Sequence, residues 1–445
     1  MYKNDNFFKT VCNLAIPVAL QSMLQSSFSI IDQIMIGQLG SANIAGVGFA
    51  GKFVSIFSVI ISAIGAVAGI MISQYLGQKN TAKVKQSFYT NLFLCAIIVG
   101  IFSILCTLFP EQIMGVYTKD FATKQAAAAY LILITGTFIP LAGATLLSTL
   151  LRCTENPKLP LYASILSAIS NTVLNYVFIF GKLGFAPMGV KGAAIATVIS
   201  QYINFILMIL MMPKKNSILA KSLKPKTTNT QFNWKQYFAM LLPILVCEVA
   251  WSLGENVYAA IYGHMGTNSS AAITLINPIQ GLMIGALCGL AQAASIIVGK
   301  KLGNSEYVDA YVASKKLILY GVIGSVMLSV VIILTSSIYV EIYQVDEIVK
   351  QLTKQILLAY AMVAPFKVLN MILGGGIIRS GGKTKYVMFI DIIGTWCFGV
   401  PLGLLSAFVL ELPIYYVYFL LSLEECIRFG ISLIIFRKKR WMNCL

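Results

Sequence analysis

Residues 50–76 read AGKFVSIFSVIISAIGAVAGIMISQYL, and this stretch holds one charged side chain, that of Lys52. About 20 apolar residues of α-helix cross the hydrocarbon layer of a bilayer, so a run of this length predicts a membrane-spanning helix. Eleven further windows have the same character, at residues 13–37, 88–110, 127–151, 159–181, 192–212, 237–263, 272–299, 316–340, 354–378, 385–410 and 414–436. The sequence therefore predicts an all-α integral membrane protein with twelve transmembrane helices.

Composition supports this class. Of the 445 residues, 58% are hydrophobic and 11% are charged, whereas soluble domains carry about a quarter of charged residues. Too few polar residues remain to cover a soluble fold, which excludes a soluble enzyme, a disordered chain and a secreted disulfide scaffold. The windows are too long and too continuous for the strands of an outer-membrane barrel. The first window lacks a small-residue cleavage signal, so we expect a retained span there.

The net charge of +17 indicates orientation once the basic residues are placed between the windows. Of the 33 Lys and Arg residues, 24 fall at the termini and in alternate connections, six fall in the other connections, and three lie at or within windows. Because basic residues accumulate on the cytoplasmic side, we expect both termini in the cytoplasm and the chain in the cell (cytoplasmic) membrane. The basic excess then marks orientation, and no nucleic-acid partner is expected.

The two halves of the chain resemble each other. One constant shift along the sequence places Pro17 on Pro243, and it also places Gly37, Gly40 and Leu76-Gly77 on identical residues of the second half. A lysine-rich polar stretch at 213–236 separates the halves. We therefore predict an N-terminal six-helix bundle at 1–212, a cytoplasmic linker at 213–236 and a C-terminal six-helix bundle at 237–445. Because each half has an even number of spans, the halves form parallel repeats.

Ionisable side chains within the windows are the candidate functional residues, because each costs about 2.5–3.5 kcal/mol to insert into hydrocarbon. Glu424 and Arg428 are four residues apart, the spacing of a self-neutralising helix pair. Asp391 and Lys367 are candidates for a pair between windows ten and eleven. The acids at membrane depth are Asp32, Glu248, Glu255, Asp391, Glu424 and Glu425.

Asp32 lies in the first window, and its functional interpretation is a cation or proton site. Asn171 and Asn175 are one helical turn apart in the fifth window, and Thr197 lies in the sixth. Amide and hydroxyl oxygens are ligands for Na⁺, and they equally hydrogen-bond a protonated acid, so the coupling ion is left open as Na⁺ or H⁺. The alternative is structural: an acid capped by polar groups, with the small residues near Thr197 allowing close helix packing.

Glu248 and Glu255 are seven residues apart in the seventh window and share one helix face, and Trp251 lies on the same helix. Carboxylates and an aromatic ring suit an organic cation, whereas hydrogen bonding between helices is the alternative. No enzyme is indicated, because His264 is the single histidine and the nine cysteines lack metal-ligand spacing. No P-loop is present, so ATP is not the expected energy source, and no cofactor is expected.

Four motifs together resemble the multidrug and toxic compound extrusion (MATE) family of antiporters over essentially the whole chain. They are Ile31-Asp32-x-x-Met35-x-Gly37-x-Leu39-Gly40, Gln74-Tyr-Leu-Gly77, Pro243-x4-Glu248-x2-Trp251 and Arg379-Ser-Gly-Gly382-Lys-Thr384. The resemblance implies a V-shaped pair of bundles that exports small, cationic, amphipathic organic compounds in exchange for Na⁺ or H⁺. We expect the chain to act as a monomer.

The same resemblance implies roles for single residues. Asp32, Asn171 and Thr197 fit the family's cation site, with Asn175 in place of a second Asp, and Pro17 fits a helix-bending proline. Glu248 fits an acid of the seventh span, while Lys367 stands where another acid is expected. A flippase for a lipid-linked or oligosaccharide precursor is the alternative function. It would require more basic residues at membrane depth than Lys52, Lys367 and Arg428.

Overall fold

The computed structural model describes residues 4–36, 38, 41–118, 120–212, 232–343 and 345–445, with the side chains of residues 4–6, 29, 30, 33 and 41–44 left undescribed. Within these ranges the regular structure is helical throughout, which confirms the predicted all-α class. Helices satisfy every backbone hydrogen bond within one segment, as a bilayer requires. Most of the predicted linker lies outside the described residues, and its last residues belong to a helix that begins at Trp234.

The chain divides into two compact units. The C-terminal unit comprises Met1–Ala19, Ser73–Lys79 and Asn233–Leu445, and the N-terminal unit comprises Leu20–Ile72 and Asn80–Phe232. These boundaries differ from the predicted division at residue 212, because the start of the first helix and the end of the second belong with the C-terminal unit. The boundary in the first helix follows Ala19, close to Pro17.

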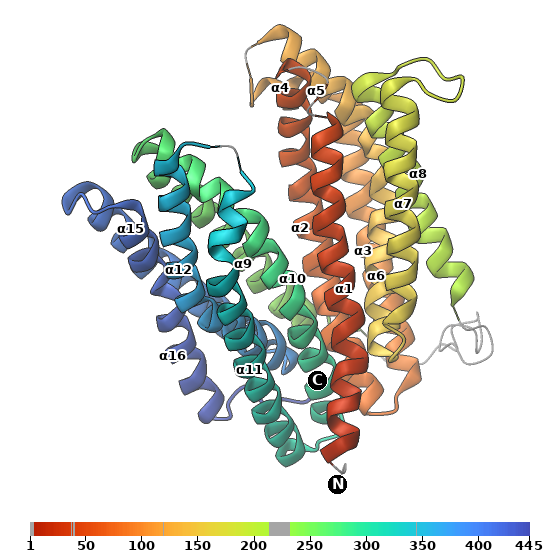
Figure 1. Ribbon diagram of the computed structural model, residues 1–445. Coiled ribbons are helices and arrows are strands. Elements are labelled where there is room, and N and C mark those ends of the chain that lie inside the picture. The colour runs from red at the N-terminus through yellow and green to blue at the C-terminus, as the bar shows by residue number, and fades with distance from the viewer. Residues whose placement is uncertain (1–3, 37, 39–40, 119, 213–231, 344) are drawn as a thin grey trace. The chain divides into compact units, whose positions relative to one another are not determined.

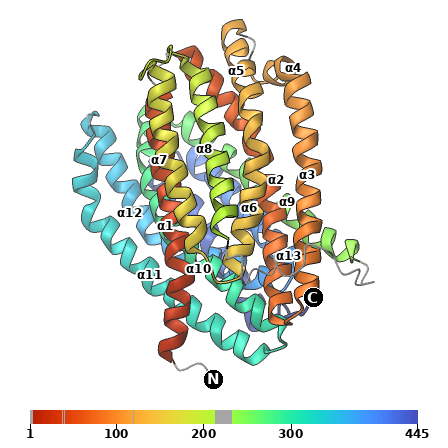
Figure 2. The same ribbon diagram turned by 90° about the vertical axis from the view of Figure 1, so that its right-hand side faces the viewer.

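The N-terminal unit consists mainly of long helices. Asn80 and Asp120 cap two of them, because their side chains accept hydrogen bonds from the backbone N–H of Lys83 and Thr123. Helices α7 and α8 run side by side (Figures 1 and 2). The elements of this half of the chain, of which the start of α1 and the end of α2 belong to the C-terminal unit, are α1 (Asn4–Ile36), α2 (Ser41–Gly77), α3 (Thr81–Leu108), α4 (Pro110–Gly115), α5 (Phe121–Ile134), the 3-10 turn η2 (Thr135–Thr137), α6 (Phe138–Cys153), α7 (Lys158–Phe180) and α8 (Gly189–Met211).

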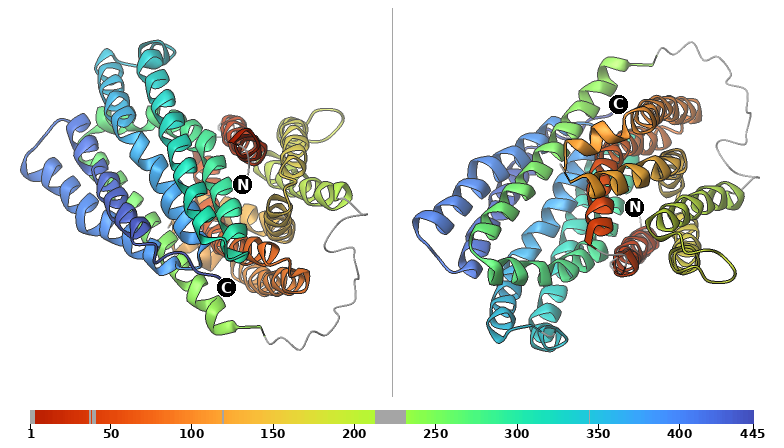
Figure 3. Two further views of the ribbon diagram at one scale, coloured as in Figure 1. Left: turned by 90° about the horizontal axis from the view of Figure 1, so that it is seen from below. Right: turned by 90° about the horizontal axis from the view of Figure 1, so that it is seen from above.

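The C-terminal unit contains longer helices and three π-helical segments. Helices α10, α11 and α12 lie next to one another, as the end-on views show in green to cyan (Figure 3). The elements are α9 (Trp234–His264), α10 (Thr267–Gly303), α11 (Tyr307–Glu341), α12 (Glu347–Asn370), η3 (Met371–Ile378), α13 (Thr384–Ile392), η4 (Ile393–Gly399), α14 (Val400–Leu404), η5 (Leu405–Val409), α15 (Ile414–Ser422) and α16 (Glu424–Arg437).

Eleven of the twelve predicted windows fall on helices, among the described residues, that are long and apolar enough to cross a membrane. The twelfth window, 414–436, is divided by Leu423 into α15 and α16. At this position the Leu423 N–H donates to the carbonyl of Leu420, three residues back, so the regular α pattern is interrupted. Residues 414–436 are therefore helical except at Leu423, whose backbone angles (φ −60°, ψ −18°) are themselves in the right-handed helical region, so the two helices follow each other directly.

Helix α11 shows why the fold suits a lipid environment. Its buried side carries small or hydroxyl residues such as Ser314, Gly321 and Ser325, whereas Leu334 is 72% exposed and Ile338 is 70% exposed. A soluble helix would show the reverse pattern. Small residues at helix contacts allow close packing, and large apolar residues outside meet lipid tails.

The last turns of α2 and α10 pack against each other within the C-terminal unit. A Cβ at Gly77 would clash with the carbonyl of Lys300, and a Cβ at Gly303 would clash with the carbonyl of Gln74. The shift that pairs Pro17 with Pro243 also pairs Gly77 with Gly303 and Gln74 with Lys300. Each glycine therefore meets the residue that corresponds to its own helix neighbour, a reciprocal contact of the kind expected between two parallel repeats.

Candidate functional site

The four residues predicted to form an ion site in the N-terminal unit lie together. The Nδ2 of Asn175 donates to Asp32 Oδ1 at 2.5 Å and to Asn171 Oδ1 at 3.2 Å. The Nδ2 of Asn171 donates in turn to the hydroxyl oxygens of Thr197 and Ser200, both at 3.4 Å. A chain of polar contacts thus joins α1, α7 and α8. Ser200 was missed at the sequence level.

Close packing of α7 and α8 holds this polar chain in place. A Cβ at Gly192 would lie 2.7 Å from the backbone carbonyl of Phe178, so glycine is required where the helices meet. Ala193, Ala194 and Ala196 are buried on the same helix. The hydroxyl of Ser167 on α7 donates to the carbonyl of Ser200 on α8 at 2.6 Å. Close helix packing by these small residues is therefore compatible with an ion site at the polar chain.

Asp32 has no cationic counterpart in the part of the chain that the structure describes. No Lys or Arg among the described residues forms an ion pair with it, and its carboxylate accepts a hydrogen bond from the neutral amide of Asn175. The Oδ1 of Asn175 is itself buried without a hydrogen-bond partner. A carboxylate at membrane depth among neutral groups is costly as an anion, and a bound proton or cation removes that cost.

A second charged cluster lies in the C-terminal unit around Arg428. Its guanidinium is within 3.6 Å of Glu424 Oε1, 3.7 Å of Asp391 Oδ1 and 4.0 Å of Glu425 Oε2, and it also donates to the Thr395 hydroxyl. The predicted Glu424–Arg428 pair is therefore confirmed. Arg428, Glu424 and Glu425 are each 6–7% exposed, whereas the Asp391 side chain is 24% exposed, so two of the three carboxylates share the guanidinium away from solvent.

Neutral groups donate further hydrogen bonds to these carboxylates. The Tyr258 hydroxyl donates to Glu424 Oε2 at 2.5 Å, and Asn370 Nδ2 donates to Glu425 Oε2 at 2.8 Å. The Cys247 thiol donates to Asp391 Oδ2 at 2.7 Å. These contacts distribute the negative charge but do not neutralise it, because each partner is uncharged.

The predicted pair of Asp391 with Lys367 is wrong. Asp391 instead faces Arg428, which packs against η4, where Gly394 leaves room because a Cβ there would clash with the Arg428 side chain. The side chain of Lys367 forms no ion pair with any residue that the structure describes. Sequence spacing places residues on a helix face, but the partner from another helix depends on how the helices pack.

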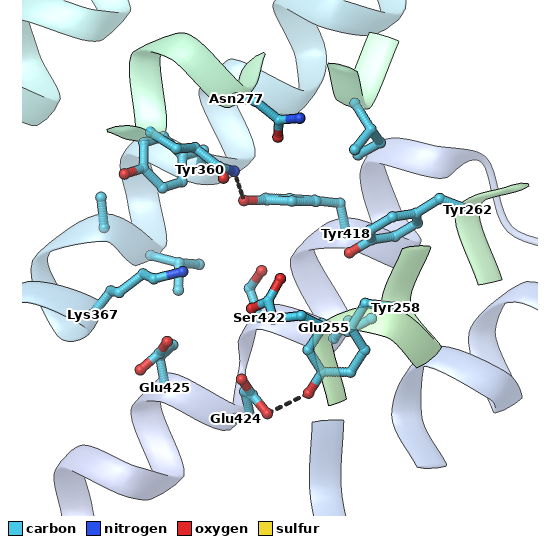
Figure 4. A pocket seen from close by; sticks show the side chains of 15 residues that line it. Glu255, Tyr258, Tyr262, Asn277, Tyr360, Lys367, Tyr418, Ser422, Glu424 and Glu425 are labelled. Carbon is cyan, nitrogen blue, oxygen red and sulfur yellow. Dashed lines mark hydrogen bonds between the residues drawn. The ribbon is translucent and has the colours of Figure 1, made fainter. Parts of the chain in front are cut away.

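The predicted substrate residues on α9 occupy different surroundings. Glu248 lies 4.0 Å from the guanidinium of Arg379. Trp251 lines a cavity of about 240 Å³, which is also lined by Lys367, Arg379 and Arg428. Glu255 lines a neighbouring cavity of about 90 Å³ (Figure 4). Among the described residues, Trp251 and Glu255 thus line two different cavities.

The smaller cavity is walled by tyrosines that sequence reasoning missed. Tyr258 and Tyr262 come from α9, Tyr360 from α12 and Tyr418 from α15, and all four are buried (Figure 4). The hydroxyl of Tyr418 accepts a hydrogen bond from Gln280 Nε2 at 2.6 Å. The spacing of Tyr258 and Tyr262 relative to Glu255 was a usable signal on α9, but nothing local connects them to Tyr360 or Tyr418.

Eleven helices that are long and apolar enough to cross a membrane, among the described residues, define a multi-pass membrane protein. The family model MatE matches residues 17–177 and 243–405. The chain therefore belongs to the MATE family of multidrug efflux transporters, and its members are transporters, not enzymes. The two matched segments begin at Pro17 and Pro243, which are residues that the internal repeat pairs.

Individual relatives match this chain over most of their length. A probable multidrug resistance protein NorM of Thermotoga maritima is 22% identical, covering 97% of this chain and 93% of the relative. A probable multidrug resistance protein YoeA of Bacillus subtilis is 25% identical, covering 90% of this chain and 87% of the relative. The crystal structure of a mutant of the Vibrio cholerae MATE transporter VcmN matches with a TM-score of 0.88 at 17% identity, covering 98% of this chain and 97% of that one. These similarities do not favour the flippase alternative.

Proposed function

We propose that this chain is a secondary active antiporter that exports cationic amphipathic compounds in exchange for H⁺, with Asp32 as the group that binds the ion. The observation that carries the proposal is the uncompensated Asp32 carboxylate, which contacts the neutral amide of Asn175 at 2.5 Å. An ion bound at this position would be released when the carboxylate meets the opposite side of the membrane. Family membership supports ion-coupled efflux in general.

The local hydrogen bonds favour H⁺ over Na⁺ as the coupling ion. Asn175 turns its Nδ2 toward both Asp32 and Asn171, and Asn171 turns its own Nδ2 toward Thr197, so these amides are arranged as hydrogen-bond donors around the acid. A half-turn of the Asn175 amide would present its unpartnered Oδ1 to Asp32, where it would accept a hydrogen bond from the protonated acid. The same amide thus serves both protonation states. Na⁺ at Asp32, Asn171, Asn175 and Thr197 is the alternative that the experiment below tests.

Coupling to conformation is proposed to run through α1. Asp32 lies near the end of this helix, and the helix contributes residues to both units, with the boundary after Ala19. Pro17 lacks a backbone N–H and lies inside the helix, so it is the proposed site of bending. Ion binding then shifts the equilibrium between conformations only because protonated and ionised Asp32 interact differently with Asn175.

Substrate is proposed to meet the α9 residues Glu248, Trp251 and Glu255. Of the two acids on α9, Glu255 forms no ion pair with a described residue, whereas Glu248 forms an ion pair with Arg379. We further propose that the chain acts as a monomer in the cell membrane, with both termini in the cytoplasm and with two six-helix halves joined by the 213–236 linker.

Efflux from proteoliposomes with separately imposed pH and Na⁺ gradients tests this proposal. We expect the purified chain to export a fluorescent cation such as ethidium when a pH gradient alone is applied. The Asp32→Asn variant keeps the size of the side chain but cannot gain or lose a proton, so it should lose at least 90% of the gradient-driven rate.

Glu111→Gln is the matched control, because Glu111 is an exposed acid on α4 of the same unit. It should export at the wild-type rate. Export that follows the Na⁺ gradient alone would replace H⁺ by Na⁺ as the coupling ion. Wild-type export by Asp32→Asn, with correct insertion confirmed, would refute the role of Asp32.

A further inference from the structure

Lys367 on α12 is a half-buried lysine that lines both cavities of the C-terminal unit. Its side chain makes no hydrogen bond or ion pair with any part of the chain that the structure describes. Figure 4 shows the side chain extended into the smaller cavity, near Glu424 and Glu425. An ammonium group at membrane depth is expensive when it has no partner, so a lysine in this position requires an explanation.

The nearby carboxylates already have other partners. Glu424 accepts a hydrogen bond from Tyr258 and faces Arg428, and Glu425 accepts from Asn370 and faces Arg428. Lys367 lies beyond ion-pair distance of both. Its charge therefore acts on Glu424 through space, while its ammonium group has no direct contact with a charged partner among the described residues.

The two cavities differ in charge on either side of Lys367 and Glu425, which line both. The smaller one, of about 90 Å³, carries Glu255, Glu424 and Glu425 among its tyrosines, with Lys367 as the one basic residue of its lining among those described. The larger one, of about 240 Å³, carries Lys367, Arg379 and Arg428 against Asp391 and Glu425, and it includes the ring of Trp251. The lining of the larger cavity thus holds more basic residues than that of the smaller one, although Arg379 and Arg428 face acids.

We propose that this pair of cavities binds an amphoteric compound, with its carboxylate on Lys367, which lines both cavities, and its amine on Glu255 in the smaller one. A carboxylate would give the ammonium a charge-assisted hydrogen bond, and the tyrosines would surround the cationic end. Each cavity is smaller than the usual site of a drug-sized ligand, so each accommodates one end of the molecule. The inference rests on the proposed function and narrows its substrates to cations that also carry a carboxylate.

The competing explanation gives Lys367 a structural role, in which it only balances the excess negative charge of Glu424 and Glu425. The two explanations differ in what the ligand needs. A structural lysine supports every ligand alike or none, whereas a binding lysine discriminates between a carboxylate and its ester.

The test measures binding of two dyes by fluorescence anisotropy to the purified full-length chain, without any gradient. Rhodamine 110 carries a free carboxylate, and rhodamine 123 is its methyl ester with the same cationic ring system. We expect the wild-type chain to prefer the acid. Lys367→Gln should lower the ratio of acid to ester affinity about tenfold, equivalent to about 1.4 kcal/mol, while Lys367→Arg should retain it.

Two further variants separate this effect from general damage. Lys354→Gln removes an exposed lysine from the same helix and should leave the ratio unchanged. Glu255→Gln should weaken both dyes alike, because both carry the cationic end. The inference would be overturned if the Lys367→Gln variant had the same ratio of acid to ester affinity as the wild type. Failure of the proposed function would appear separately, as dye export from vesicles that ignores both gradients.

Discussion

Arg428 illustrates how single side chains are balanced in this protein. One guanidinium faces Asp391, Glu424 and Glu425, and the two glutamates are buried with it. Desolvation makes each of these charges expensive, and their attraction offsets the cost only while the set is complete. The arginine is therefore required because of the acids, not because an ion pair is intrinsically stabilising.

Replacing Arg428 by Met should destabilise the protein by about 3–5 kcal/mol, because three carboxylates lose their cation. Thermal unfolding in detergent measures the effect. Adding Glu424→Gln and Glu425→Gln to this variant should recover part of the loss. Arg437→Met, on the exposed last turn of the same helix, is the control and should unfold like the wild type. Equal melting of the Arg428 and Arg437 variants would contradict the prediction.

Among the helices, glycines in irregular segments make the charged cluster possible. The π-helical segment η4 contains Gly394 and Gly399, and a Cβ at Gly399 would clash with both Tyr258 and Glu424. A π-helical turn shifts the face that follows it, and such turns are frequent at functional sites. The reciprocal glycines at the ends of α2 and α10 serve a different purpose, because there the backbones themselves touch.

Gly77→Ala and Gly303→Ala should each lower stability by about 1–3 kcal/mol, because the new methyl group meets a backbone carbonyl that cannot rotate away. The double variant should cost less than the sum, since both changes open the same helix contact. Gly100→Ala on α3 has open space around it and should be neutral or stabilising by up to about 1 kcal/mol. Thermal unfolding of the four variants measures these changes in stability. An equal change for Gly77→Ala and Gly100→Ala would refute the close contact between α2 and α10.

In the molecule as a whole, the repeat extends to side-chain contacts. Arg152 donates to Gln21 Oε1 at 2.8 Å in the N-terminal unit, and Arg379 lies 4.0 Å from Glu248 in the C-terminal unit. A shift one residue longer than that of the glycines places Arg152 on Arg379 and Gln21 on Glu248. The first pair is a hydrogen bond to a neutral amide that also donates to Ser164, and the second is an ion pair, so equivalent positions carry different charge.

The predicted orientation is also a property of the whole chain. Green fluorescent protein fused after Leu445 should fluoresce in a bacterial host, and alkaline phosphatase fused there should be inactive, because it requires the oxidising periplasm. Phosphatase fused after Gly184, between α7 and α8, is the control and should be active. Active phosphatase at the C-terminus would reverse the orientation.

The membrane class, the position of eleven spans and the repeat could be predicted from the amino-acid sequence alone, because lipid permits only long apolar helices and a duplicated chain keeps its spacing. The four predicted residues of the Asp32 cluster could be named in the same way, since oxygen-bearing side chains are rare and conspicuous in apolar windows.

In contrast, only the folded molecule shows which charged side chains from different helices contact one another. Arg428 rather than Lys367 meets Asp391, Leu423 divides the last span, and four tyrosines from three helices line one cavity. These outcomes depend on how helices pack, and packing is set by the shapes of side chains that meet at contacts far apart in the sequence.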